Sequence, residues 1–196
     1  MSSRCLMGTA LLQKLNNDHK DIARILYCFR TQIRGYEDPE STPNTSQIMN
    51  ILDYITYVPE RWHHPIEDLI FTRLLERSPP HPQQIKAVLR EHEDLERLTE
   101  ELKAAFDQVA MDITVPVAHL YRTATIYLSR QLLHLDAEET VIFPMAEELL
   151  TEDDWNELDE LAEEALESFD ESTKIEYDKL RDDILNFEEN PYQQGD

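Results

Sequence analysis

The chain has 196 residues, with 41 Asp and Glu side chains against 18 Lys and Arg and a formal net charge of −23. Three glycines are too few for a series of tight β-turns or a glycine-rich phosphate loop, which argues against β-sandwiches, β-barrels and nucleotide-binding α/β folds. The acidity argues against binding to nucleic acids or to anionic membrane surfaces.

Four long helices are predicted for the first 150 residues. Loop-forming residues interrupt the chain at 37–45, 78–82 and 111–116. Between these loops apolar residues recur every three or four positions, which predicts helices near 10–35, 46–77, 82–109 and 116–149. Pro59 and Pro65 fall inside the second helix, and because each removes a backbone donor, we expect a kink or a restart near Trp62.

Two more helices are predicted at the C-terminal end. Thr151 followed by Asp154 resembles a capping box that opens a helix reaching about residue 166, and a sixth helix is expected over 172–187. Residues 151–196 carry 18 acidic and 3 basic side chains, whereas residues 1–150 have a net charge of only −8. We therefore expect one domain over 1–150 and an acidic helical extension over 151–196, whose charges form a solvated face.

Amphipathic helices joined by short loops favour an up-down-up-down four-helix bundle. The predicted fold class is therefore all-α, with additional acidic helices after the bundle. The acidic extension could bind a second copy of the chain, as in a homodimer, or another protein.

The apolar faces of the four helices contain histidines and glutamates. The helical phase places six of them on the buried side, at His19, His63, Glu67, His92, His134 and Glu138. A lone buried histidine is usually a core residue hydrogen-bonded to a neighbour. These six, however, fall at one level of an antiparallel bundle, roughly 15 Å from the same end at 1.5 Å rise per residue. The shared level favours a metal site over isolated core histidines.

Four imidazoles and two carboxylates suit a pair of borderline metal ions, with iron first and manganese or zinc less favoured. Each ion would take two histidines, and both glutamates could bridge. Such a set leaves coordination positions for a small ligand. It differs from the ferritin-type set, which needs ExxH on two helices; only Glu60 and His63 have that spacing here.

Four stretches of the chain together resemble the hemerythrin-like HHE cation-binding domains, over roughly residues 11–149. They are LNNDHKDI (15–22), RWHHPIEDLIF (61–71), REHEDLERL (90–98) and HLDAEETVIFP (134–144). The resemblance implies two oxo- or hydroxo-bridged iron ions, with His19, His63, His92 and His134 as terminal ligands and Glu67 and Glu138 as bridges. It also implies a non-haem di-iron protein that binds or reacts with O2, NO or peroxide, in the response to redox or nitrosative stress or in iron handling.

This sequence departs from the oxygen-carrying hemerythrins. Those proteins use a fifth histidine one turn from the third-helix ligand, where this chain has Val88 and Glu96, and an aspartate on the fourth helix, where this chain has HxxxE. The branch that repairs iron centres commonly adds an N-terminal cysteine-bearing domain, which the two cysteines here do not suggest. The alternative function is a metal-binding or apo helical interaction module, and the sequence leaves open whether the protein is an enzyme.

Several neighbouring residues have two interpretations. His64 adjoins His63 but points about 100° away around an α-helix, so we expect it at the rim or behind the ligands. Glu96 could ligate a metal, although a surface ion pair with Arg97 or Lys103 is favoured. Tyr127 could donate a hydrogen bond to a metal-bound oxygen species or simply pack in the core. The apolar residues expected to seal the site from water are Phe71, Ile142 and Phe143.

The remaining features concern the compartment. Cys5 and Cys28 give no disulfide framework, which predicts a reducing cytoplasm. The apolar stretch 5–12 is short and runs into polar residues, so it makes a poor signal peptide. No segment approaches the roughly 18 apolar residues that a membrane span needs. The protein is therefore expected to be cytoplasmic.

Overall fold

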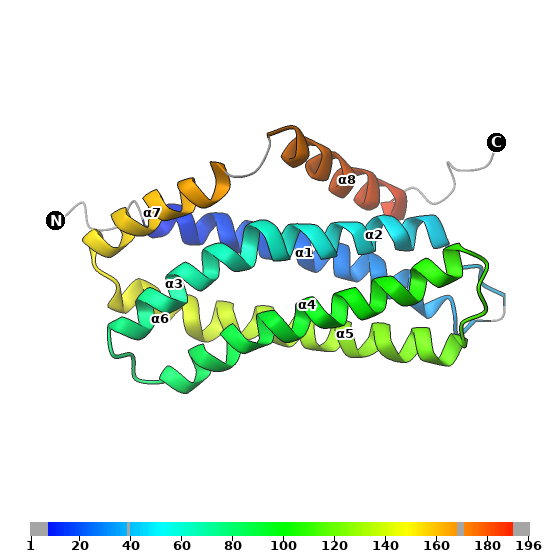
Figure 1. The fold of residues 1–196 in the computed structure, drawn as a ribbon, viewed down its shortest axis with the longest axis horizontal. Helices are drawn as coiled ribbons and strands as arrows, with labels where there is room; N and C mark the ends of the chain where they lie inside the picture. The colour runs from blue at the N-terminus through cyan, green and yellow to red at the C-terminus, as the bar shows by residue number, and fades with distance from the viewer. Residues whose placement is uncertain (1–7, 39, 168–170, 190–196) are drawn as a thin grey trace.

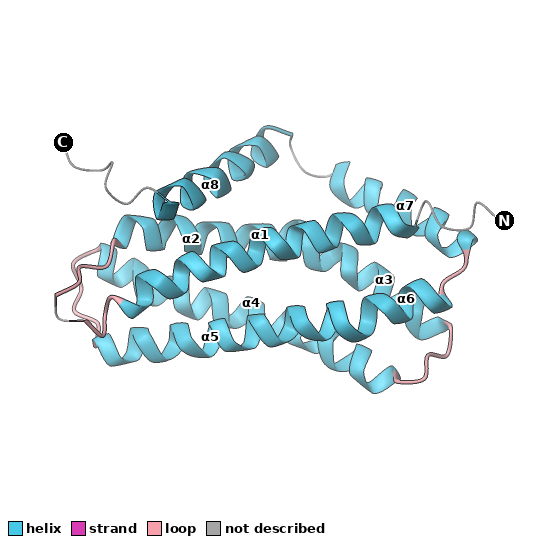
Figure 2. Ribbon diagram, turned by 180° about the vertical axis from the view of Figure 1, so that it is seen from behind, coloured by secondary structure: helices cyan, strands magenta, loops and turns pink. Residues whose placement is uncertain are grey.

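The computed structural model describes residues 8–38, 40–167 and 171–189. In this part of the chain there are eight α-helices, two π-helical turns and no strand, as Figures 1 and 2 show. The predicted all-α class is therefore confirmed. The helices form an elongated bundle with two further helices lying along one side.

The bundle consists of four rods, two of which are interrupted. The first and third rods are α1 (Gly8–Arg34) and α4 (Pro82–Ala110). The second is α2 (Thr45–Val58), η1 (Pro59–His63) and α3 (His64–Glu76); the fourth is α5 (Val117–Ala137), η2 (Glu138–Ile142) and α6 (Phe143–Leu149). Contacts join α1 to α2, α2 to α4, α4 to α5 and α5 to α1. The rods therefore close a ring, as an up-down-up-down bundle requires.

Each interruption is a π-helical turn followed two residues later by a proline. The expected break near Trp62 is η1, which ends before Pro65, and η2 ends in the same way before Pro144. A proline ring collides with the carbonyl four residues back and offers no N–H. Widening the preceding turn relieves this conflict, because the N–H of His64 and that of Phe143 bond the carbonyls of Pro59 and Glu138, five residues back.

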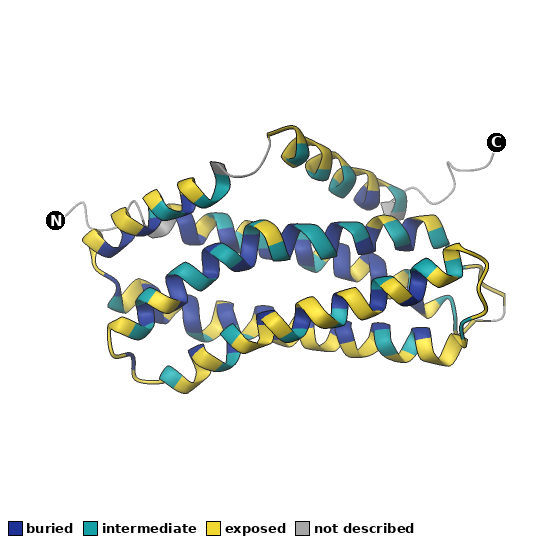
Figure 3. Ribbon diagram, in the orientation of Figure 1, coloured by how far each residue is buried: buried dark blue, intermediate teal, exposed yellow. Residues whose placement is uncertain are grey.

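The core is divided into two apolar clusters. One contains Ile22, Phe29, Leu52 and Phe106, and the other contains Leu15, Phe71, Ile85 and Ala146, among further residues. On every rod, buried histidines or glutamates lie between the residues of the first cluster and those of the second. A polar layer therefore separates the two apolar clusters. Figure 3 shows the continuous buried interior of the bundle.

The two C-terminal helices lie on the first and second rods. α7 (Glu152–Glu167) packs against α1 and α3, and α8 (Glu171–Glu189) packs against α1 and α2. The predicted capping box is present: the N–H of Asp154 bonds the Thr151 hydroxyl, and the Thr151 N–H bonds the Asp154 carboxylate. Most polar residues of both helices are exposed, as predicted for the extension, but Asp154 is buried.

The expected compartment depends on the absence of a membrane span and on the two cysteines. Within the described residues, no helix combines the length and the hydropathy needed to cross a membrane. Cys28 is buried in the first apolar cluster. Cys5 and the start of the apolar stretch 5–12 lie outside the described residues.

Candidate metal centre

The polar layer between the two apolar clusters brings together all six side chains that the sequence singled out, and one more. Each of these residues is at most 5 % exposed. The seven residues of the polar layer are His19, His63, His64, Glu67, His92, His134 and Glu138.

The interrupted rods position the two glutamates. His63 ends η1 and Glu67 lies in the first turn of α3, while His134 is in the last turn of α5 and Glu138 begins η2. In each rod the histidine and glutamate are four residues apart and therefore face the same side. His19 from α1 and His92 from α4 meet them from the other two rods.

The two carboxylates lie between imidazoles of different rods. Glu67 Oε1 is 3.2 Å from His19 Nε2 and 3.1 Å from His63 Nε2, and its other oxygen is 3.6 Å from His92 Nε2. Glu138 Oε1 is 3.3 Å from the Nε2 atoms of both His92 and His134, and its Oε2 is 3.5 Å from His19 Nε2. Both glutamates thus occupy positions from which one carboxylate reaches both halves of the layer.

In every imidazole of the layer, Nε2 faces the interior of the bundle and is called the inner nitrogen, and Nδ1 is the outer nitrogen. A carboxylate other than Glu67 and Glu138 faces each outer nitrogen. The Nδ1-to-oxygen distances are 3.0 Å for His19 and Glu139, 3.6 Å for His63 and Asp18, 3.3 Å for His64 and Glu60, 2.7 Å for His92 and Asp68, and 3.5 Å for His134 and Glu91. At His19, His64 and His92 the carboxylate is within hydrogen-bond distance, so it can hold the proton at Nδ1 and leave the Nε2 lone pair available for a metal ion. At His63 and His134 the carboxylate lies near Nδ1, but the nitrogen has no hydrogen-bond partner among the described residues.

The carboxylates set the charge states of the layer. Burial alone would lower the pKa of His63, but Glu67 and Asp18 raise it to about 10. For His92, Asp68 and Glu138 likewise outweigh burial and raise the pKa to about 10. Burial works against the charge of Glu67 too, yet the neighbouring histidines hold its pKa well below the ordinary value. Before metal binds, the imidazolium groups of His63 and His92 therefore lie beside the Glu67 carboxylate.

Of the two positions expected for His64, at the rim or behind the ligands, the rim is wrong. Its side chain is buried, and its ring stacks on that of His92 with centroids 4.2 Å apart. One ligand-type atom each from His64, Glu67, His92 and His134 falls within 4.8 Å of the others. Burial and the neighbouring His92 lower the pKa of His64 well below its ordinary value, so its imidazole is neutral and able to coordinate.

The π-helical turn explains the position of His64. The predicted divergence of about 100° between His63 and His64 assumes an α-helix. A π turn spreads its residues over a wider loop, so adjacent side chains diverge less. Because η1 ends at His63, both histidines can face the interior. In the sequence, the signal for this π turn is Pro65, the proline directly after the two histidines.

The carboxylates at Nδ1 were also missed, although the sequence contains their pattern. An acidic residue precedes each single histidine, as Asp18 and Glu91, and another follows the glutamate of each buried HxxxE, as Asp68 and Glu139. Each of the four pairs with a histidine of a neighbouring rod. The first two rods and the last two rods, which form the two halves of the bundle, therefore carry the same pattern of histidine–carboxylate pairs. His64 breaks the repeat, since Leu135 stands at the corresponding position of the second half.

Other residues singled out from the sequence lie outside the layer. Glu96 is exposed. The expected ion pair is wrong, because Arg97 pairs with Asp94 and Glu101 and Lys103 pairs with Asp53 and Asp107. Tyr127 is buried in the first apolar cluster, where burial raises its pKa and it hydrogen-bonds with Thr99.

Apolar rings close the layer, as expected. Phe143 stacks on His19 with ring centroids 5.3 Å apart. Phe71 stacks on His92 with centroids 6.1 Å apart. Ile142 is buried in the same apolar cluster as these two rings. Together they keep the inner face of the layer in an apolar surrounding, which strengthens electrostatic interactions there.

The donor atoms of the layer fit metal ions. Among the described residues, the atoms that are buried without a hydrogen-bond partner include His63 Nε2, His64 Nε2, His134 Nε2, Glu67 Oε2 and Glu138 Oε2. Unpaired buried polar atoms are costly, and these converge on two groups, one around His64, Glu67, His92 and His134 and the other around His19, His63 and Glu67. Imidazole and carboxylate donors in such groups are the ligands of first-row transition metals.

Comparisons with known proteins agree with this geometry. The family model described as the hemerythrin HHE cation binding domain matches residues 41–146, which is more than half of the chain and covers the second and third rods and most of the fourth. A search of curated proteins found no match, and a search of solved structures found none. The match and the buried histidine–glutamate layer indicate a hemerythrin-like protein that binds metal ions. The chain belongs to the hemerythrin HHE cation-binding domain family.

Proposed function

We propose that this protein is a non-haem di-iron protein that binds or reacts with a small diatomic molecule or peroxide. The observation that supports this proposal best is the convergence of five imidazole Nε2 atoms around two buried carboxylates, in two adjacent groups. Two groups that share Glu67 suit two metal ions joined by a bridging carboxylate. Iron is the first choice for mixed imidazole and carboxylate donors, ahead of manganese or zinc.

In this proposal the two metal ions receive different numbers of imidazoles. His64, His92 and His134 would hold one ion, and His19 and His63 the other, with Glu67 and Glu138 bridging. The ion held by two histidines would have fewer protein ligands and would therefore leave more positions for an external ligand. The asymmetry follows from His64, which has no histidine counterpart in the second half of the bundle.

The surrounding residues act on the ligands. A nearby carboxylate would hold the proton at each Nδ1 and so fix the orientation of each imidazole ring, with Nε2 towards the metal. These carboxylates belong to Asp18, Glu60, Asp68, Glu91 and Glu139. The rings of Phe71 and Phe143 keep bulk water from the inner face. When bound, a pair of iron ions would supply two redox-active centres that can exchange electrons with a small ligand.

The biological role proposed here is a response to redox or nitrosative stress, or iron handling, in the cytoplasm. The family membership and the low cysteine content support this role. Partners beyond the small ligand would bind through α7 and α8, either as a second copy of the chain or as another protein.

Metal analysis of the purified full-length protein, together with its optical spectrum, tests the proposal. About two iron ions per chain with oxo-bridge absorption would support it; a colourless bundle that does not take up iron on reconstitution would overturn it in favour of an interaction module. Stopped-flow mixing of the reduced protein with oxygen, nitric oxide and peroxide would then separate the activities. A stable adduct would indicate a carrier or sensor, and rapid turnover an enzyme.

A further inference from the structure

The solvent-facing side of α1 is basic. Every exposed charged side chain that the structure describes on this helix is a cation, and the four are Lys20, Arg24, Arg30 and Arg34. Residues three or four apart share one face of an α-helix, so these cations and Tyr27 follow one line along the outside of the bundle. This set of five residues is called the basic stripe. It stands out in a chain with a net charge of −23.

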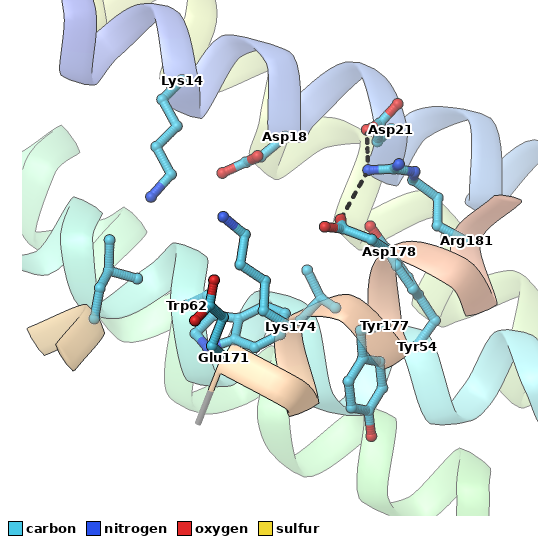
Figure 4. Close-up of a pocket in the computed structure, with 12 residues that line it drawn as sticks. Lys14, Asp18, Asp21, Tyr54, Trp62, Glu171, Lys174, Tyr177, Asp178 and Arg181 are labelled. Atoms are coloured by element: carbon cyan, nitrogen blue, oxygen red, sulfur yellow. Dashed lines mark hydrogen bonds and ion pairs between the residues drawn. The ribbon is translucent and has the colours of Figure 1, made fainter. Parts of the chain in front are cut away.

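The carboxylates of α1 lie on another side of the helix. Figure 4, a close-up of the space between α1 and α8, shows Asp18 and Asp21 on the side that faces α8. Asp21 accepts a hydrogen bond from Arg181 at 3.1 Å and lies 3.9 Å from Arg24. Asp18 lies 3.6 Å from the outer nitrogen of His63. Both acidic side chains of α1 are therefore engaged next to the stripe and do not belong to it.

Most of the basic stripe has no counter-charge in its own chain. Within the part of the chain that the structure describes, Lys20, Arg30 and Arg34 form no ion pair with a carboxylate. Arg30 instead lies over the ring of Tyr27, 5.1 Å from its centroid, and Tyr27 is 60 % exposed. Tyrosine and arginine are enriched among the residues that dominate protein–protein binding. The stripe therefore suits a protein partner with an acidic surface.

α7 has the opposite character. Residues 152–167 include no basic side chain, and the exposed carboxylates described there are Glu152, Asp153, Glu157, Glu160, Glu163 and Glu164. These six form the acidic face of α7. Glu157 pairs with Arg73 at 2.7 Å, whereas no described cation pairs with Glu160, Glu163 or Glu164. Like charges three and four residues apart on a helix repel, so this face also lacks a counter-charge.

The basic stripe and the acidic face lie on neighbouring sides of one copy. α7 packs against α1, and Figure 2 shows α1 in front with α7 above one of its ends. Two surfaces on adjoining sides of a molecule can each meet the other in a second copy, across a two-fold axis that passes midway between them. Such an arrangement makes two identical contacts and closes at a dimer.

From this charge pattern we propose that the protein forms a two-fold symmetric dimer, in which the basic stripe of each copy binds the acidic face of α7 of the other. A nucleic acid would neutralise the stripe but leave α7 without a counter-charge, whereas a second copy neutralises both surfaces. Screening over about 8–10 Å at physiological ionic strength limits repulsion between the more distant charges of the two copies.

The dimer is a specific form of the proposed partner binding through the C-terminal helices, and it rests on that part of the proposed function. It does not rest on the di-iron centre. The mass of the protein in solution reports on the dimer, and its iron content reports on the metal centre, so the two proposals fail separately.

Size-exclusion chromatography with light scattering tests the dimer on the full-length protein. At about 50 mM salt the mass should be twice the 23.1 kDa of one chain. At about 1 M salt, where charges act over only about 3 Å, the mass should fall towards that of one chain. Loss of the dimer in salt is the expected behaviour of a contact made by exposed charges.

Two charge-reversal variants make a sharper test. Arg30→Glu with Arg34→Glu makes part of the stripe acidic, and Glu160→Lys with Glu164→Lys makes part of the α7 face basic. Each double variant alone should associate with itself at least about tenfold more weakly, because like charges then meet at both contacts. A one-to-one mixture of the two double variants should form a dimer, because both contacts again join opposite charges.

The matched control is Lys86→Glu with Arg90→Glu, two exposed cations four residues apart on α4. This variant changes the net charge as much as the α1 variant does, and it should associate like the original protein. Circular dichroism checks the fold of every variant, and elemental analysis compares their iron content.

Four results would overturn the proposal. The first is a monomer at low salt and about 100 μM protein. The second is equal weakening in the α4 control, which would show an effect of net charge alone. The third is the absence of a dimer in the mixture of the two double variants, which would show that α1 and α7 do not meet. The fourth is binding of duplex DNA to a monomer that is lost in the α1 variant, which would assign the stripe to a nucleic acid.

Discussion

The imidazole of His64 lies flat on that of His92, with ring centroids 4.2 Å apart and planes within 6°. His64 also meets His134 edge to face, with centroids 5.6 Å apart. Its Nε2 is buried without a hydrogen-bond partner, while Glu60 faces its Nδ1 at 3.3 Å. Like the four histidines that the sequence pattern identified, His64 is buried with a carboxylate at its Nδ1, and it makes one half of the polar layer richer in imidazole than the other.

The substitution His64→Leu tests this assignment, because leucine occupies the corresponding position 135 of the second half. We expect the iron content to fall from about two ions per chain towards one, since one ion loses a ligand and the other keeps its own. Elemental analysis with circular dichroism measures the effect. His119→Ala, an exposed histidine at the start of α5, serves as the control. Equal iron content in both variants would contradict a ligand role for His64.

The glutamates of the fourth rod differ in their expected effects. Glu138→Gln should remove most of the bound iron, because Glu138 approaches His19, His92 and His134. Glu139→Gln should weaken iron binding by about 10- to 100-fold, since Glu139 faces the outer nitrogen of His19 at 3.0 Å. Competition with a chelator of known affinity measures both effects.

The adjacent Glu139 is thus unsuitable as a neutral control for Glu138. Glu148, exposed on α6, is the matched control, and Glu148→Gln should bind iron like the unmodified protein. If Glu139→Gln is indistinguishable from Glu148→Gln, the carboxylates at the outer nitrogens do not support the centre.

The helices were largely predictable because their apolar spacing and their loops are both regular. The third and fourth rods begin and end within one residue of the prediction, at Pro82–Ala110 and Val117–Leu149. The π-helical turn η2 was not predicted, and it changes the phase of the residues after Glu138. The pairs at Nδ1 were not predicted either, because helical periodicity gives the face of a residue but not its partner on a neighbouring rod. His64 was misplaced because the expected break near Trp62 is a π-helical turn, η1, which changes the phase of the residues that follow it.

The contact of α8 with the bundle should contribute to stability. Ile184 is fully buried, and its carbonyl accepts a hydrogen bond from the buried Gln47 side chain of α2 at 3.1 Å. Ile184→Ala should therefore lower the free energy of unfolding by about 2–4 kcal/mol through loss of packing. On the same helix Ile175 is 63 % exposed, and Ile175→Ala should change it by less than about 0.5 kcal/mol. Urea unfolding followed by circular dichroism compares them. Similar values for both variants would show that α8 does not unfold together with the bundle.

The buried carboxylate of Asp154 joins α7 to the second rod. Its oxygens accept hydrogen bonds from Arg77 Nε at 2.9 Å and from Arg73 Nη1 at 3.0 Å. Burial would raise the pKa of Asp154, but Arg77, Thr151 and Arg73 together hold it well below the ordinary value. Asp154→Asn should lower the free energy of unfolding by about 1–3 kcal/mol near neutral pH, because the buried side chain loses its ion pairs with the half-buried Arg73 and the exposed Arg77.

The effect of Asp154→Asn should depend on pH in a defined direction. A carboxyl whose pKa is lower in the folded than in the unfolded state stabilises the fold above the unfolded value of about 3.9, and this contribution is lost as the pH falls towards the folded value. The difference between the original protein and Asp154→Asn should therefore be constant from about pH 7 to 5 and shrink below about pH 4. Asp153→Asn, an exposed neighbour on α7, should show a small effect with no comparable trend. A difference for Asp154→Asn that stays constant down to pH 3 would mean that its ion pairs with Arg73 and Arg77 do not stabilise the fold.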